Sequence, residues 1–147
     1  KTAFPDIEQA VKRYLKKIRF FLPVFVHIAK EEKETKHRLP QEVMDKEAER
    51  ILKFVKRDGY LVSWDRSGKM MTSEEYAGLF RQWLDQGVKS LYMVVGGALG
   101  LSPLVLNISR EIISLSPMTF PHDMVRIIIA EQTYRALTII NGIPYHK

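Results

Sequence analysis

The clearest hydrophobic pattern lies near the end of the chain, between Pro121 and Asn141. Apolar residues recur there at helical spacing and predict one long helix: Val125, Ile128, Ile129, Leu137 and Ile140. Pro121 is well placed to open this helix. Asn141-Gly142 is suited to end it, because both residues tolerate the left-handed conformation of a helix C-cap. A polar tail, Pro144-Tyr145-His146-Lys147, follows.

Three further segments carry apolar stripes at helical spacing. Residues 4–18 and 40–58 predict amphipathic helices, and Asp58-Gly59 supplies an end for the second. Residues 72–85 predict a third helix, because a Ser or Thr cap and an acidic first turn precede its apolar positions. A short helix is predicted from Pro103 to about Arg110.

Short runs of apolar residues alternate with these helices. Four of them predict strands, at residues 22–28, 60–64, 91–95 and 112–115, with loops at 30–40 and 65–68. Alternating helices and apolar strands predict an α/β fold with a parallel sheet covered on both faces. No linker divides the sequence, so we expect one domain spanning residues 1–147.

Composition narrows the class of protein. The 147 residues are 46% hydrophobic, which favours a folded domain over disorder. There are no cysteines, which excludes disulfides and thiolate chemistry. No apolar run approaches the ~20 residues of a membrane span, and no signal-peptide pattern precedes the first helix, so we expect a cytoplasmic protein without membrane contact. The histidines show no metal-ligand spacing, so we expect no metal site.

The net charge of +6 permits binding to a polyanion such as RNA. The first predicted helix concentrates part of this charge in a basic cluster: Lys12, Arg13, Lys16, Lys17 and Arg19. A solvated helix face and an RNA contact both remain open for this cluster.

A glycine cluster, Gly96-Gly97-Ala98-Leu99-Gly100, directly follows the most apolar predicted strand. Ligands of open α/β sheets bind at this carboxyl end of the strands, and glycine lets a ligand lie against bare backbone. The spacing matches neither the dinucleotide fingerprint nor the ATP-binding loop. A tight structural turn and a cofactor loop therefore both remain open.

Trp64 also stands at the end of a predicted strand. If neighbouring strands are parallel, Trp64, Gly96 and Leu115 converge at one rim of the sheet. Such an apolar slot, floored by backbone, suits an adenine ring and a sulfonium group better than a polyphosphate. The alternative is that Trp64 is a core aromatic.

The long last helix carries two polar pairs at spacing four. His122 and Arg126 share one face, and Glu131 and Arg135 form a second pair on roughly the opposite side. One side of the helix would then face a site and the other a partner. Two solvated pairs are the alternative.

Three motifs carry a resemblance to a known family: VVGGALGLS at 94–102, LSPMTFPH at 115–122 and the YHK ending. In this order and spacing they resemble the RlmH family, ribosomal RNA large-subunit pseudouridine methyltransferases of the SPOUT superfamily. The resemblance runs from about Lys46 to the last residue. It implies a three-layer α/β knot with a C-terminal trefoil, a homodimer, and S-adenosyl-L-methionine as cofactor.

The resemblance also implies roles for individual residues. Cofactor-binding positions would be Trp64, Gly96, Gly97, Leu115, Ser116, Pro117, Met118, Thr119 and Phe120. Catalytic positions would be His122, Arg126, Tyr145 and His146, with His146 as the candidate proton acceptor. Residues on the substrate and dimer side would be Glu131, Arg135 and Lys147.

The function implied is methyl transfer to N3 of a pseudouridine in 23S ribosomal RNA, with ribosomal RNA or the ribosome as partner. A SPOUT-like RNA-binding protein without activity is the alternative. The sequence departs from the family at two points. Trp64 replaces a common leucine, and the sequence starts at Lys1 without the family's first strand, which implies a shortened sequence or an altered sheet edge.

Overall fold

The computed structural model describes residues 4–147, which form two compact units. Unit 1 contains residues 4–25, 71–88 and 120–147, and unit 2 contains residues 26–70 and 89–119. Each unit is therefore assembled from segments that are distant in the sequence. In the described residues, no helix is both long and apolar enough to cross a bilayer.

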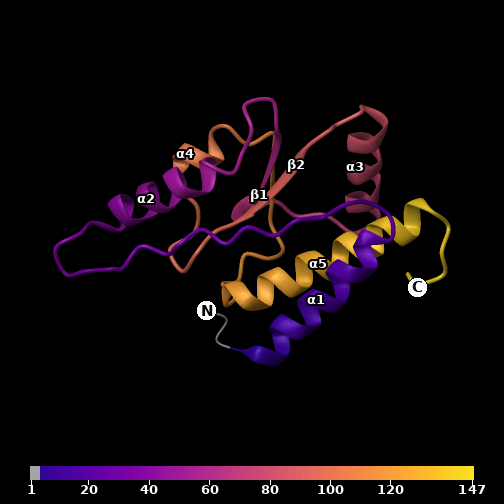
Figure 1. Ribbon diagram of the computed structural model, residues 1–147, viewed down its shortest axis with the longest axis horizontal. Helices are drawn as coiled ribbons and strands as arrows, with labels where there is room; N and C mark the ends of the chain where they lie inside the picture. The colour runs from indigo at the N-terminus through magenta and orange to yellow at the C-terminus, as the bar shows by residue number, and fades with distance from the viewer. Residues whose placement is uncertain (1–3) are drawn as a thin grey trace. The chain divides into compact units, whose positions relative to one another are not determined.

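Unit 1 is helical. It contains α1 (Pro5–Arg19), α3 (Ser73–Asp85) and α5 (His122–Ile140), and α5 packs against both of the others. Figure 1 shows α1 and α5 lying side by side. These three elements confirm the helices that the hydrophobic spacing predicts at 4–18, at 72–85 and after Pro121.

Local sequence explains where the helices of unit 1 begin and end. At the start of α3 the Glu75 N–H donates to the Thr72 hydroxyl (3.1 Å), and the Thr72 N–H donates to the Glu75 carboxylate (2.8 Å). This reciprocal capping box satisfies two N–H groups that the helix leaves unpaired. After α5, Gly142 has φ of +67°, the left-handed conformation predicted for the helix end.

The core of unit 1 is rich in aromatic rings from α3. The rings of Tyr76, Phe80 and Trp83 contact one another edge-on or tilted, with centroids 5.4–6.4 Å apart. The Tyr76 hydroxyl lies 2.8 Å from the Thr133 hydroxyl of α5. Burial raises the pKa of Tyr76, so this side chain stays neutral and links α3 to α5 through a buried hydrogen bond.

Unit 2 contains the sheet, whose strand order is β2-β1-β3 and whose pairs are all parallel. Its strands are β1 (Tyr60–Lys69), β2 (Leu91–Val95) and β3 (Glu111–Ile113), and its helices are α2 (Pro40–Leu52) and α4 (Pro103–Leu106). A buried cluster joins strands and helices: Ala48, Leu61, Val94, Leu101 and Val105. The predicted α/β class with a parallel sheet is thereby confirmed.

The strand predicted at 22–28 is wrong, because these residues form no regular secondary structure. The Phe25 and Ile28 side chains, which the pattern would bury, are 79% and 75% exposed. A strand is stabilised by pairing its N–H and C=O groups with a neighbour, and Pro23 has no N–H to offer. β-branched and aromatic composition alone does not supply that neighbour.

Several predicted boundaries also shift. The helix predicted at 40–58 ends at Leu52, and the one predicted to reach Arg110 ends at Leu106. In both cases the chain tightens, because N–H groups after the helix donate to carbonyls three residues back, as from Phe54 to Ile51 (3.0 Å). The last strand is Glu111–Ile113 rather than 112–115.

The predicted turn at 65–68 lies inside β1. Trp64 and Lys69 both pair with Ile113, so residues 65–68 form a bulge within the strand. The Ser67 N–H and hydroxyl both donate to the Asp65 carboxylate (3.0 and 2.5 Å). At Gly68 a Cβ would lie 2.6 Å from the backbone of Ile112, so glycine is required where the bulge returns to the strand.

The charged segment 30–39 is irregular, as predicted, and contacts α2 at two residues: the Lys30 carbonyl accepts from Arg50 (2.8 Å), and Glu32 makes the other contacts. Glu32 forms ion pairs with both Arg38 and Arg50, and its N–H donates to the Glu47 carboxylate (3.1 Å). These guanidinium hydrogen bonds hold the pKa of Glu32 below its usual value. The loop therefore approaches α2 through ionised Glu32.

Candidate active site

Backbone register brings three predicted site positions of unit 2 to one edge of its sheet. Trp64 pairs with Val95 on β2 and with Ile113 on β3. Gly96 follows Val95 directly, and Leu115 lies two residues beyond Ile113. The predicted convergence of these positions is therefore confirmed for the backbone, but Trp64 does not end its strand as predicted, because β1 continues to Lys69.

The Trp64 side chain is buried, with 6% of its surface exposed. It lies in the central strand of the sheet, between β2 and β3. Burial of the ring agrees with the core-aromatic alternative, and contact of Trp64 with a cofactor stays a prediction.

The glycine cluster forms a tight turn. The Gly100 N–H donates to the Gly97 carbonyl (3.0 Å), and Gly100 has φ of +87°. A Cβ on Gly96 would lie 2.7 Å from the carbonyl carbon of Gly100 and 3.0 Å from the Leu101 nitrogen. Glycine is thus needed at position 96, because the chain folds back against its own backbone there and leaves no room for a Cβ. The tight turn by itself therefore explains this glycine.

Carboxylates surround this turn. Glu47 Oε2 lies 3.3 Å from the position of a Cβ on Gly97, and Asp65 Oδ1 lies 3.6 Å from that of a Cβ on Gly100. Two residues after Gly100, the Ser102 hydroxyl donates a hydrogen bond to the Asp45 carboxylate of α2 (2.6 Å). Such surroundings favour a positively charged group over a polyphosphate.

A small cavity of about 10 Å³ lies between α2 and the glycine turn, with room for about one water. Its lining includes Met44, Glu47, Gly96 and Gly97. Glu47 was not among the predicted site residues, because no local motif marks it. The available signal is its position one turn from Met44 and Ile51 on the inward face of α2.

The segment predicted to hold a cofactor, 115–120, leaves the sheet after β3. Ser116 organises its start, because its carbonyl accepts from the Ser114 hydroxyl (3.1 Å) and its hydroxyl accepts from the Met118 N–H (3.1 Å). Arg66 donates to the Thr119 hydroxyl (2.9 Å). Residues 115–119 belong to unit 2, and Phe120 begins the last segment of unit 1.

Several backbone groups of this segment are available to a ligand. Among residues 4–147, no protein acceptor receives the N–H of Leu115 or Thr119, and no protein donor reaches the carbonyls of Pro117 and Met118. The Met118 side chain is 70% exposed. An exposed loop with free donors and acceptors beside apolar side chains suits the edge and face of a purine ring.

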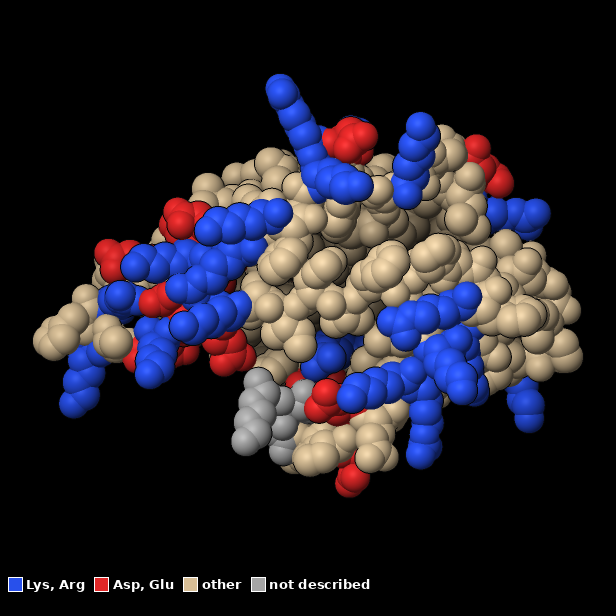
Figure 2. All heavy atoms as spheres, in the orientation of Figure 1, with Lys and Arg blue, Asp and Glu red and all other residues tan. Residues whose placement is uncertain are grey.

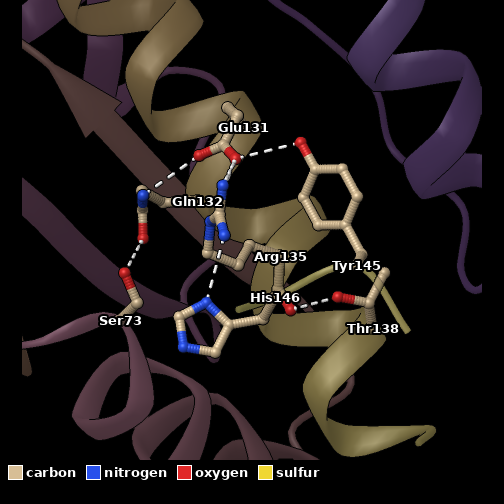
Figure 3. Close-up of polar contacts among 7 residues, drawn as sticks. All are labelled: Ser73, Glu131, Gln132, Arg135, Thr138, Tyr145 and His146. Carbon is tan, nitrogen blue, oxygen red and sulfur yellow. Dashed lines mark hydrogen bonds and ion pairs between the residues drawn. The ribbon is translucent and has the colours of Figure 1, made fainter. Parts of the chain in front are cut away.

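A second polar group lies in unit 1 and ties the C-terminal tail to α5 and α3 (Figure 3). Glu131 accepts from Arg135 Nε (3.0 Å) and from the Tyr145 hydroxyl (3.1 Å). Arg135 Nη1 lies 3.0 Å from His146 Nδ1, and His146 Nε2 lies 2.7 Å from the Glu74 carboxylate. The predicted Glu131–Arg135 pair is confirmed, and Tyr145 and His146 of the tail both contact it. We call Glu74, Glu131, Arg135, Tyr145 and His146 the tail cluster.

Ring contacts and charge reinforce this tail cluster. The Tyr145 ring meets the Tyr134 ring edge-on, with centroids 4.8 Å apart, and the Arg135 guanidinium lies 4.9 Å from the Tyr145 ring centre. Burial raises the pKa of Tyr145, which keeps its hydroxyl protonated as a donor to Glu131. The hydrogen bond to Glu131 raises the pKa of Arg135.

The contacts of His146 determine its tautomer. A guanidinium only donates hydrogen bonds, so Nδ1 of His146 must accept from Arg135 with its lone pair. In a neutral imidazole the proton then sits on Nε2, which donates to Glu74. This donation holds the pKa of Glu74 below its usual value. The lone pair that could accept a proton is therefore on Nδ1 and faces Arg135.

Further members of the tail cluster were not anticipated. The Ser73 hydroxyl donates to the Gln132 side chain (2.7 Å), whose amide nitrogen donates to Glu131 (3.0 Å). Glu74 lies in the acidic first turn of α3. No sequence spacing connects it to residue 146, so only the packing of α3 on α5 could reveal the contact.

The other two predicted catalytic residues form a separate group at the start of α5. Asp123, which is 2% exposed, has its Oδ1 3.5 Å from His122 Nε2 and 3.7 Å from Arg126 Nη1. Among the described contacts, none joins this group to Tyr145 or His146. His122 and Arg126 share one face as predicted, whereas Asp123, which contacts both, was not among the predicted site residues. The Lys147 side chain is exposed.

Comparisons with known proteins agree with the motifs. A family model described as "Predicted SPOUT methyltransferase" matches residues 1–146. A protein of Syntrophobacter fumaroxidans named Ribosomal RNA large subunit methyltransferase H is 42% identical, covering 100% of this chain and 94% of that protein. Proteins of the same name from Halothermothrix orenii and Bacillus pumilus are 40% and 36% identical, each covering 96% of this chain and 91% of the relative.

Proposed function

The chain belongs to the SPOUT methyltransferase family, and we propose from this that it methylates ribosomal RNA of the large subunit. The observation that carries the proposal is near full-length similarity to proteins named Ribosomal RNA large subunit methyltransferase H. The acceptor we propose is N3 of a pseudouridine in 23S ribosomal RNA. The partners are ribosomal RNA or the ribosome, which places the enzyme in the cytoplasm.

A methyltransferase requires a methyl donor, and the donor proposed is S-adenosyl-L-methionine. When bound, it supplies an electrophilic methyl group on a positively charged sulfonium. The carboxylates of Glu47 and Asp65 beside the glycine turn are consistent with a cationic ligand. The free backbone groups of 115–119 are consistent with recognition of an adenine edge. The residues proposed to hold the cofactor are therefore Trp64, Gly96, Gly97 and Leu115–Phe120.

The side chains of the tail cluster have two tasks in this proposal. The acceptor N–H must lose its proton as the new carbon–nitrogen bond forms. His146 is the proposed proton acceptor, and its lone pair is on Nδ1. The contact with Arg135 must therefore open before the proton can transfer, which frees the guanidinium to meet a phosphate. Glu131 keeps the Tyr145 ring oriented, and this ring is the proposed stacking surface for the target base.

We propose that the two units act as one domain, since the family match spans segments of both. The three-layer arrangement and C-terminal trefoil knot of the family belong to the same proposal, as does the homodimer. His122, Arg126 and Lys147 are proposed to lie on the RNA side of the enzyme. Light scattering should give about twice the mass of one chain, and an active monomer would rule out the dimer.

The test is methyl transfer in a purified system. The protein, S-adenosyl-L-methionine and large ribosomal subunits lacking the modification are incubated, and digested nucleosides are analysed by mass spectrometry. We expect one added methyl group on a pseudouridine, absent when cofactor or protein is omitted. Calorimetry is run in parallel with S-adenosyl-L-methionine. RNA binding without cofactor binding or transfer would instead support the RNA-binding protein without activity.

A further inference from the structure

The C-terminal half of α1 carries a stripe of cations that ends on an exposed aromatic ring. Arg13, Lys16, Lys17 and Phe20 are spaced i, i+3, i+4 and i+7, so they share one helix face. Phe20 is the C-cap of α1 with helical dihedral angles (φ −61°, ψ −33°), so it continues the stripe. Its side chain is 83% exposed. At 1.5 Å per residue the stripe runs for about 10 Å.

Aromatic rings from two helices lie beside this stripe. The Tyr134 ring of α5 is 6.2 Å from Tyr14 and 6.4 Å from Phe21, centre to centre. Lys17 Nζ lies 5.7 Å from the Tyr14 ring centre and 5.2 Å from that of Tyr134. Lys17 therefore links the cations to the rings. We call Arg13, Lys16, Lys17, Phe20, Phe21 and Tyr134 the basic aromatic surface.

The charge of this surface is not neutralised by the residues that the structure describes. Within residues 4–147, Arg13, Lys16 and Lys17 form no salt bridge, whereas their neighbour Lys12 pairs with Glu8 (3.5 Å). Figure 2 shows Lys and Arg side chains gathered over α1, at the lower right of the view. Uncompensated cations on a helix face favour a polyanionic partner.

The exposed ring narrows the class of polyanion. Single-stranded RNA offers phosphates to cations and unpaired bases that stack on aromatic side chains. A duplex hides its base faces within the helix stack, so it can use the cations but not Phe20. A second copy of this chain fits poorly, because a two-fold interface places the same patch on both subunits and would set cations against cations.

We propose that the basic aromatic surface binds a single-stranded segment of the RNA substrate. Arg13, Lys16 and Lys17 contact phosphates, and Phe20 stacks on an unpaired base. The inference rests on the proposed function and assigns a substrate-holding role to α1, outside the motifs that carry the family resemblance. Under this proposal the basic cluster is an RNA contact rather than a solvated helix face.

The test measures binding of a fluorescein-labelled single-stranded RNA of about 20 nucleotides by anisotropy, alone and annealed to its complement. The plot of log affinity against log salt concentration has a negative slope, and each phosphate contact contributes about 0.7 to its magnitude. Arg13→Gln combined with Lys16→Gln removes two such contacts and should lower the magnitude of the slope by about 1.4. The matched control, Lys53→Gln with Lys56→Gln, removes the same charge from exposed positions of unit 2 and should leave the slope unchanged.

Phe20→Ala tests the stacking contact. We expect about tenfold weaker binding of the single strand and unchanged binding of the duplex. Phe25→Ala is the matched control, because its ring is 79% exposed but lies beyond Pro23 and off the stripe. Thermal unfolding should be unchanged in both variants, since neither ring is buried.

Three results would overturn the proposal: equal effects of the stripe variants and their controls, unchanged RNA affinity, or conversion of a dimer to a monomer by Phe20→Ala. The last would identify the surface as a contact between subunits. Failure of the proposed function gives a different pattern. Wild type would then transfer no methyl group to ribosomal subunits, while the stripe variants would still lose RNA affinity.

Discussion

The tight turn at the glycine cluster predicts that Gly96→Ala damages folding as well as cofactor binding. The added Cβ would lie 2.7 Å from the Gly100 carbonyl carbon, whereas ordinary contacts begin at 3.4 Å, so the turn must open by about 0.7 Å. The atoms in its way are backbone, which cannot rotate aside as a side chain can. The change therefore strains the same turn that is proposed to meet the cofactor.

The magnitude follows from two opposing effects. Forcing one extra carbon into a closely packed site costs about 1–3 kcal/mol. Reducing the freedom of the unfolded chain by replacing glycine returns about 0.4–1 kcal/mol. The net loss of about 1–2 kcal/mol should lower Tm by about 2–8 °C for a chain of this length.

Gly78→Ala is the matched control, since this glycine lies inside α3 and nothing lies within 4 Å of the added Cβ. Alanine is the better helix former by about 1 kcal/mol, so Tm should rise by about 2–4 °C. The assays are thermal unfolding by circular dichroism and calorimetry with S-adenosyl-L-methionine. A Gly96→Ala variant that unfolds at the wild-type temperature would refute the steric argument, whether or not it binds cofactor.

Three further predictions concern unit 1. Thr72→Ala removes half of the capping box of α3 and should cost about 1 kcal/mol in urea unfolding; no change would show that the cap is dispensable. Deleting residues 145–147 removes the Tyr145 ring and the hydrogen bonds to Glu131, so unfolding free energy should fall by about 1–3 kcal/mol, and wild-type stability would indicate an undocked tail. The hydrogen bond from His146 lowers the pKa of the Glu74 carboxyl below its ordinary value of 4.5. This contact therefore stabilises the folded protein above pH 4.5, and the stabilisation is lost as the pH falls through the lowered pKa of the folded state. The stability difference between wild type and Glu74→Gln, measured by urea unfolding from pH 7 to pH 3, should shrink on acidification, and a constant difference would contradict the linkage.

Local sequence by itself determined most of the helices and the extent of one edge strand, β2. The extent of β2 at 91–95, the capped start of α3 and the end of α5 just before Asn141-Gly142 all followed from spacing and capping residues. These features depend on interactions within a few residues, which a linear pattern contains. The Glu131–Arg135 pair was predictable for the same reason, since a spacing of four is a contact in any helix.

Tertiary structure alone decided the features that require a distant partner. Segment 22–28 has strand composition but no pairing strand, and composition does not specify pairing. The return of the chain against Gly96 and the approach of Glu47 to Gly97 both depend on packing. The same holds for His146, whose tautomer is fixed by Arg135 on α5 and Glu74 on α3. A motif indicates which residue types are present, whereas hydrogen-bond direction and steric fit depend on what the fold places beside them.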